Sequence, residues 1–133
     1  MFRQQFSIEK YWQVIVYYDV DYSLFGYIEE ELKDYGASES LILEIYSMLS
    51  TGEAKAVTFS NTNRHCSIVV FNPHNTKQDY INSLVHEAEH VKQAVLDAYG
   101  VDDEGEAPAY TIGYIVGQMY RGFYRLICNC RKP

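Results

Sequence analysis

The amino-acid sequence predicts an α+β domain that ends in two long helices. Two kinds of segment support this class. Short runs of β-branched and aromatic residues are typical of strands, and stretches with apolar residues three and four positions apart are typical of amphipathic helices. These segments follow one another in the order β-α-α-β-β-α-α. A chain of 133 residues can bury one sizeable core, so we expect a single domain over residues 1–133.

The first half of the chain predicts one strand and two helices. Residues 12–18 are aromatic and β-branched, as expected of a buried strand. A helix is predicted over residues 22–35, where apolar residues recur every four positions before Gly36 provides a C-terminal stop. Ser38 can then cap a second helix over residues 39–50.

The second half predicts a hairpin followed by two helices. Two apolar, β-branched runs over residues 55–60 and 65–71 flank a polar link, which indicates an antiparallel hairpin. A long helix is predicted over residues 77–99, ending before Gly100, and a last helix over residues 106–126. We expect the long helix to pack on the last helix and on a small antiparallel sheet.

Charge and composition exclude several classes of protein. The net charge is −7, from 18 acidic and 11 basic side chains, which argues against a nucleic-acid-binding face. No run approaches the roughly 20 apolar residues that span a bilayer, and the first residues lack the pattern of a signal peptide. The three cysteines, Cys66, Cys128 and Cys130, have no framework spacing, so we expect reduced thiols and a cytoplasmic protein.

The segment His-Glu-Ala-Glu-His at residues 86–90 predicts a metal site. His86 and His90 would lie about 40° apart around the helix axis and about 6 Å apart along it, so both imidazoles can bind one ion. Glu87 lies about 100° from His86, where its carboxylate can reach a water bound to that ion. The pattern therefore predicts two zinc ligands and a general base on one helix.

The rest of this helix is consistent with an open site. Its apolar side chains are predicted on the side opposite the two histidines, so His86 and His90 face solvent or a cleft rather than the core. These apolar residues are Ile81, Leu84, Val85, Ala88, Val91, Val95 and Tyr99. An ordinary solvated surface that happens to carry histidines and glutamates fits the same placement.

Glu106 is the candidate for the third protein ligand that a zinc site needs. It follows His90 by sixteen residues and opens the last predicted helix, on the same side as Tyr110, Gly113 and Gly117. The two glycines would allow close approach to the motif helix and so bring Glu106 towards the histidines. Alternatively, Glu106 only stabilises the positive N-terminus of its own helix.

The motif and the later glutamate resemble the gluzincin branch of the zincin metallopeptidases, and also small zincin-like proteins of bacteria and their phages. The resemblance covers roughly residues 80–120. It implies a zinc-dependent peptidase in which His86, His90 and Glu106 bind Zn²⁺ and Glu87 accepts a proton from the attacking water. The usual Asn-Glu or Glu-x-x-x-Asp setting of the third ligand in larger gluzincins is absent.

A peptidase also needs a hydrogen-bond donor for the developing oxyanion and a surface for its peptide or protein substrate. Tyr110 is the first candidate donor, followed by Tyr114 and His74. The strand over residues 65–71 could offer its edge to an extended peptide.

Two other functions stay open at this point. The domain could be a catalytically inactive zincin-like module that binds a partner. It could also be an acidic, tyrosine-rich interaction protein in which the motif is incidental, since 13 of its 133 residues are tyrosine.

Overall fold

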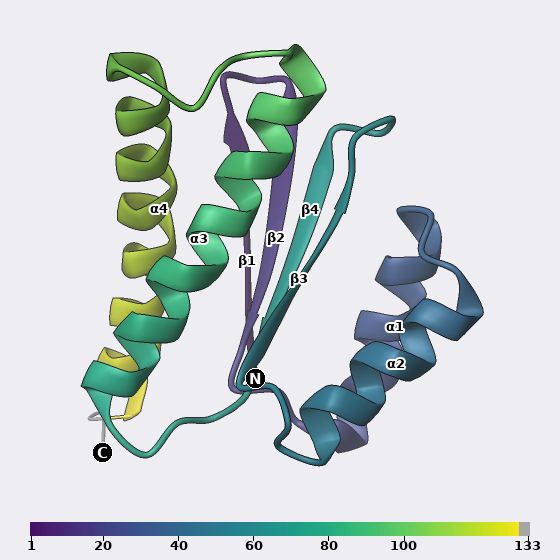
Figure 1. The fold of residues 1–133 in the computed structure, drawn as a ribbon. Helices are drawn as coiled ribbons and strands as arrows, with labels where there is room; N and C mark the ends of the chain where they lie inside the picture. Colours follow the sequence, from purple (N-terminus) through teal and green to yellow (C-terminus); the bar gives the residue numbers. More distant parts are fainter. Residues whose placement is uncertain (131–133) are drawn as a thin grey trace.

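The part of the chain that the structure describes forms four strands and four α-helices (Figure 1). The structure, a computed structural model, describes the backbone of residues 1–130 and the side chains of residues 1–128. In chain order the elements are β1 (Phe2–Ile8), β2 (Trp12–Tyr18), a 3₁₀ turn (Tyr22–Leu24), α1 (Phe25–Asp34), α2 (Glu39–Ser50), β3 (Ala56–Asn61), β4 (Cys66–Phe71), α3 (Lys77–Tyr99) and α4 (Glu106–Cys130).

The α+β class is confirmed, but the predicted order β-α-α-β-β-α-α is wrong because it omits β1. This strand reads Phe-Arg-Gln-Gln-Phe-Ser-Ile, with only alternate side chains apolar, and it lies at the sheet edge. Phe2 and Phe6 pack on the core below α4, while Arg3 points to the opposite face and bonds to Glu31 of α1. Edge strands carry a weaker apolar signal than central strands, which explains the omission.

The sheet is mixed rather than antiparallel, with strand order β1-β2-β4-β3. The predicted hairpin of β3 and β4 is antiparallel, but β4 pairs with β2 in parallel, with Ile15 opposite Ile68. β4 is therefore central and fully buried. The expectation that residues 65–71 offer an edge to a peptide is wrong, because β3 occupies that edge.

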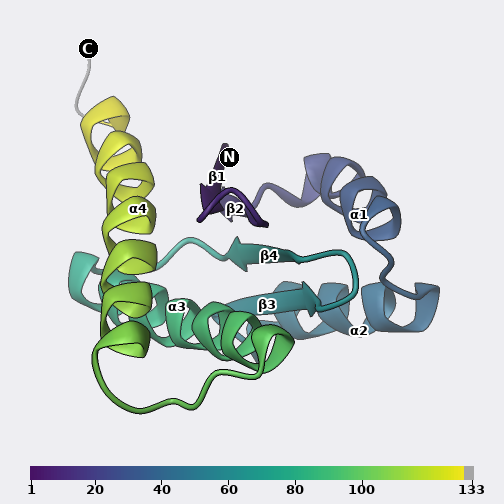
Figure 2. The same cartoon turned by 90° about the horizontal axis from the view of Figure 1, so that it is seen from above.

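Helices cover both faces of the sheet, giving three layers (Figures 1 and 2). α1 and α2 pack on one face through a core that includes Ile28, Leu32 and Ile45. α3 and α4 pack on the other face, around a second core with Trp12 and Tyr18. No helix of the described residues has the length and apolarity needed to cross a membrane.

The glycines of α4 do not lie where close packing on α3 would need them. Gly113 and Gly117 face solvent, and a Cβ added to either would have no atom within 4 Å. Close approach occurs at Gly122, where an added Cβ would lie 2.5 Å from Gln4 Oε1 and 2.7 Å from the Tyr18 hydroxyl. α4 is thus anchored on β1 and β2, and Gly113 and Gly117 do not bring it onto α3.

Candidate metal centre

The long helix α3 begins and ends as its sequence predicts. The Thr76 hydroxyl accepts a hydrogen bond from the Asp79 amide at 3.1 Å, which caps the first turn. Gly100 ends the helix in the left-handed conformation, with φ of 64°. Between these caps Leu84, Ala88 and Val91 are buried.

His86 and His90 meet on the exposed side of α3, as predicted. Their Nε2 atoms lie 3.2 Å apart, and their ring centroids are 4.8 Å apart. Two nitrogens bound to one zinc ion at about 2.0–2.1 Å in tetrahedral geometry would be about 3.3–3.4 Å apart. The pair is therefore already spaced to bind one ion, although a hydrogen bond between the rings also accounts for the distance.

Glu87 lies between the histidines and the sheet. Its side chain is only 4% exposed, and its carboxylate receives one long hydrogen bond, from the Thr58 hydroxyl at 3.5 Å. Burial raises the pKa of Glu87 above its usual value, against the opposing effects of His90, His86 and Thr58. Burial with so little hydrogen bonding leaves the charged form of this carboxyl group poorly stabilised.

Together these three side chains form a group that could hold a metal ion. Their potential ligand atoms all lie within 4.8 Å of one another. Within the described part of the chain, no other cluster of three histidine, cysteine or acidic side chains meets this geometry.

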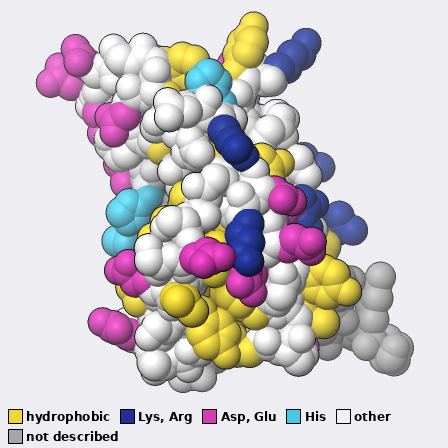
Figure 3. All heavy atoms as spheres, turned by 90° about the vertical axis from the view of Figure 1, so that its right-hand side faces the viewer, with side chains coloured by type: hydrophobic (Ala, Val, Ile, Leu, Met, Phe, Trp, Pro, Cys, Tyr) yellow, Lys and Arg dark blue, Asp and Glu magenta, His cyan; other side chains and the backbone are white. Residues whose placement is uncertain are grey.

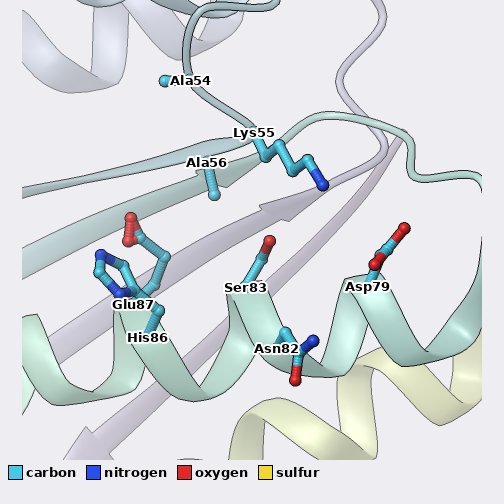
Figure 4. Close-up of a pocket in the computed structure, with 8 residues that line it drawn as sticks. All are labelled: Ala54, Lys55, Ala56, Asp79, Asn82, Ser83, His86 and Glu87. Carbon is cyan, nitrogen blue, oxygen red and sulfur yellow. The ribbon is translucent and has the colours of Figure 1, made fainter.

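The group adjoins a pocket of about 440 Å³ between α3 and the edge strand β3. Figure 4 shows Glu87, Ser83 and Lys55 pointing into the space between helix and strand. On the strand, the small side chain of Ala56 lines this space. The complete lining is Ala54, Lys55, Ala56, Asp79, Asn82, Ser83, His86 and Glu87.

Glu106 and Tyr110 lie outside this group. Glu106 opens α4, beyond the loop that follows α3, and does not join the cluster of possible ligands (Figure 1). Tyr110 is 75% exposed and lines a different hollow, beside the turn between β1 and β2. The structure thus brings His86, Glu87 and His90 together. It does not bring Glu106, the predicted third ligand, or Tyr110, the predicted oxyanion donor, to them.

The other two candidate donors have partners elsewhere. The Tyr114 hydroxyl donates to the carbonyl oxygen of Ser7 at 2.8 Å. The ring of His74 bonds through Nδ1 to the Asn72 carbonyl at 2.6 Å and through Nε2 to the Ser83 hydroxyl at 2.8 Å. Since Ser83 lines the pocket, His74 reaches the site only through this serine.

The loop that leads to Glu106 is held against α3. Asp103 accepts hydrogen bonds from Lys92 at 3.0 Å and from Gln93 at 2.6 Å, and Lys92 also pairs with Glu89 at 2.8 Å. These contacts fix the path of the loop away from the pocket, whose lining includes no residue of the loop or of α4.

Sequence reasoning missed the residues that β3 and its preceding turn bring to the site. Thr58, Lys55 and Ala56 are about 30 residues before the motif in sequence, and no motif marks them. Period-two alternation along β3 places Ala56 and Thr58 on the same face, so only knowledge of the strand order could have identified them.

Comparisons with known protein families, with curated proteins and with solved structures found no match to this chain. The likeness to gluzincins therefore depends on the motif residues alone.

Proposed function

We propose that the protein is a zinc-dependent hydrolase that cleaves peptide bonds, with His86 and His90 as zinc ligands and Glu87 as the general base. The observation that carries this proposal is the geometry of these three residues: two Nε2 atoms 3.2 Å apart beside a buried carboxylate at a pocket. The same three residues are those that the His-Glu-x-x-His pattern assigns to metal binding and proton transfer.

The chemistry divides between the metal and the chain. Bound zinc would lower the pKa of a water ligand to about 7 and polarise the scissile carbonyl. Glu87 would accept the proton of that water and pass it to the leaving amine. In the metal-free protein burial raises the pKa of Glu87, so its carboxylate has a higher proton affinity than that of an exposed glutamate.

The free edge of β3 favours a peptide as the substrate. The strand pairs with β4 on one side only, and its first residue, Ala56, borders the pocket that holds Glu87, together with Ala54 and Lys55 of the preceding turn. An extended peptide could add to this edge as a further strand and pass its backbone in front of Glu87. Besides His86, three residues that line the pocket can donate hydrogen bonds: Lys55, Asn82 and Ser83. We propose them in place of Tyr110 for contacts to the substrate.

Glu106 as the third ligand remains a separate part of the proposal. For Glu106 to reach the histidines, the loop at residues 100–105 must leave its contacts with Lys92 and Gln93. Glu106→Gln should then weaken zinc binding by about 10-fold or more, whereas Glu104→Gln, in the same loop, should not. Equal zinc affinity for the two variants would remove Glu106 from the ligand set.

The decisive experiment combines zinc content with cleavage of a peptide library. Glu87→Gln should retain zinc, because both histidines remain, while peptide hydrolysis falls by about 10²- to 10⁴-fold. Glu89→Gln, the same change at the exposed glutamate of the motif, is the matched control and should retain activity. Less than about one-tenth equivalent of zinc bound to the wild-type protein under non-chelating conditions would contradict the metal site itself.

A binding module is the second candidate function. The observation that favours it is the position of Glu106 outside the ligand group, because a site with two histidines and no third protein ligand is not a complete catalytic zinc site. Zinc binding by the wild type without cleavage of any library peptide would support this second function.

A further inference from the structure

The outward face of α4 carries an unusual set of side chains. Four tyrosines are exposed along it: Tyr110 by 75%, Tyr114 by 44%, Tyr120 by 46% and Tyr124 by 56%. They span about 120° of the helix circumference, and Gly113 and Gly117 lie between them. We call these six residues the tyrosine face.

The two glycines keep the centre of the tyrosine face flat. Both are exposed, and neither has an atom within 4 Å of the place where a Cβ would stand. Glycine in a helix interior is less favourable than alanine, so its use at two open positions costs the isolated helix stability. The flat centre would allow a second helix to approach closely, with tyrosine rings on either side.

Charge is separated along the same face. Exposed acidic residues, Glu104 and Glu106, lie at the beginning of α4, whereas exposed Arg121 and Arg125 lie near its end. The face over α1 and α2 differs, because there acidic and basic side chains are interspersed around a hydrophobic patch (Figure 3). The α4 surface thus offers an acidic end and a basic end to one partner.

Two hollows adjoin the tyrosine face, one at each end. The first, of about 970 Å³, lies between Tyr110, Tyr114 and Tyr11 at the turn between β1 and β2. The second, of about 400 Å³, is lined by Tyr120, Arg121, Tyr124 and Arg125. A partner helix that lies along α4 would meet both hollows.

We propose that this face binds a second copy of the same chain, with the two α4 helices antiparallel across a two-fold axis. Suppose that Gly113 lies against the partner's Gly117. Arg125 then lies opposite the partner's Gly105, between the acidic side chains at positions 104 and 106. Tyr110 then lies opposite the partner's Tyr120. The charges are complementary in this arrangement and like charges face each other in the parallel one, so the antiparallel pairing is favoured.

The exposed tyrosines supply a large part of the area that such a contact needs. The four tyrosine rings together expose about 400 Å², half of the roughly 800 Å² that each partner contributes to a standard interface. The arginine stems, the glycine backbone and Tyr11, which is 72% exposed, supply further area. Tyrosine and arginine are also the residues most often found at the centre of interfaces.

The dimer is independent of the proposed hydrolase. The pocket at Glu87 is lined by α3, β3 and the turn before β3, and it contains no residue of α4. Pairing through α4 leaves that pocket open, and Glu106, the candidate third zinc ligand, is the one residue that both proposals use. An absence of dimers would therefore not bear on zinc binding by His86 and His90, and an absence of zinc would not exclude the dimer.

Sedimentation equilibrium of the full chain tests the proposal, at concentrations from about 1 to 200 µM. The wild type should show a monomer–dimer equilibrium in this range. Gly117→Leu should raise the dimer Kd by about 30-fold or more, because the side chain fills the centre of the contact. The leucine meets open space and has a higher helix propensity than glycine, so the monomer should melt at a higher temperature and loss of the dimer cannot be ascribed to unfolding.

Charge reversal gives a second, independent test. Two double variants reverse the charge at one end of the face each: Arg121→Glu/Arg125→Glu and Glu104→Arg/Glu106→Arg. Each variant alone should be monomeric, and an equimolar mixture of the two should form heterodimers. Leu43→Ser, at a residue of α2 that is 70% exposed, is the matched control and should dimerise like the wild type. A wild-type protein that is monomeric throughout, or a Gly117→Leu variant that dimerises as well as the wild type, would overturn the proposal.

Discussion

Two carboxylates, Glu31 of α1 and Glu87 of α3, approach the sheet from opposite faces and have opposite surroundings. Glu31 accepts two hydrogen bonds from the Arg3 guanidinium, at 2.9 and 3.1 Å, and a third from the Tyr17 hydroxyl. Glu87 is more deeply buried, yet the Thr58 hydroxyl at 3.5 Å is its one hydrogen-bond partner among the described residues.

The pKa values of the two groups shift in opposite directions for this reason. Burial would raise the pKa of Glu31, but the hydrogen bonds from Arg3 and Tyr17 outweigh it and lower the pKa below its usual value. At Glu87 burial dominates and the pKa rises. Glu31 thus joins β1 and β2 to α1 through its hydrogen bonds, whereas the surroundings of Glu87 stabilise its charged form poorly.

Removing Glu31 should have the larger effect on stability. Glu31→Ala leaves the Tyr17 hydroxyl and the Arg3 guanidinium without their shared partner, and it should lower the free energy of unfolding by about 2 kcal/mol. The loss is no larger because Arg3 is partly exposed, with 41% of its side chain accessible, so solvent screens its charge. Urea unfolding measures the difference. Glu30→Ala, the exposed neighbour, should change the unfolding free energy by less than about 0.5 kcal/mol, and an equal loss in both variants would exclude the pairing as the cause.

The hydrogen-bonded group of Arg3, Tyr17 and Glu31 should make the free energy of unfolding fall at both low and high pH. Because the pKa of Glu31 is lowered on folding, its stabilisation is present above its ordinary pKa and is lost as the pH falls through the folded value. Burial, then the bond to Glu31, raises the pKa of Tyr17 from 10.0 to about 12, so its stabilisation is complete below pH 10 and is lost as the pH rises towards 12.

Urea midpoints of the wild type, Glu31→Gln and Tyr17→Phe across this range measure both limits. The advantage of the wild type over Glu31→Gln should shrink below about pH 4, and its advantage over Tyr17→Phe should shrink above about pH 10. If the stability differences between the wild type and the two variants stayed constant with pH, then packing, and not ionisation, would account for them.

The fold was predictable where apolar patterns were strong. β2, β4 and the helix ends at Ser38, Thr76 and Gly100 follow from local chemistry that the sequence displays. β1 escaped prediction because its alternate polar residues belong to an edge, and the parallel pairing of β2 with β4 depends on contacts between segments about 50 residues apart. Strand order is not a local property, so the apolar pattern of each strand could not specify it.

Of the candidate site, the sequence predicts only the part that lies on the single helix α3. Helical periodicity places His86 and His90 together, and their Nε2 atoms are indeed 3.2 Å apart. It could not place Glu106, whose position depends on the path of the loop after α3, nor show that Glu87 is buried beneath β3. Gly113 and Gly117 misled the prediction because glycine spacing on a helix does not reveal which neighbour, if any, lies against it.

Glu87→Gln should change the free energy of unfolding least, and in the direction opposite to Glu31→Gln. Glu87→Gln removes a buried charge with only one weak hydrogen bond, and in the metal-free protein at neutral pH it should raise the free energy of unfolding by about 1 kcal/mol. Urea unfolding in the presence of a chelator measures this change, and Glu31→Gln under the same conditions should lower the free energy instead. A catalytic carboxylate that is held at a cost to the fold is a common mark of an active site, since natural proteins give up stability where function needs a reactive group. If Glu87→Gln destabilised the protein as much as Glu31→Gln does, Glu87 would be a structural residue like Glu31, and its assignment as the general base would lose its physical support.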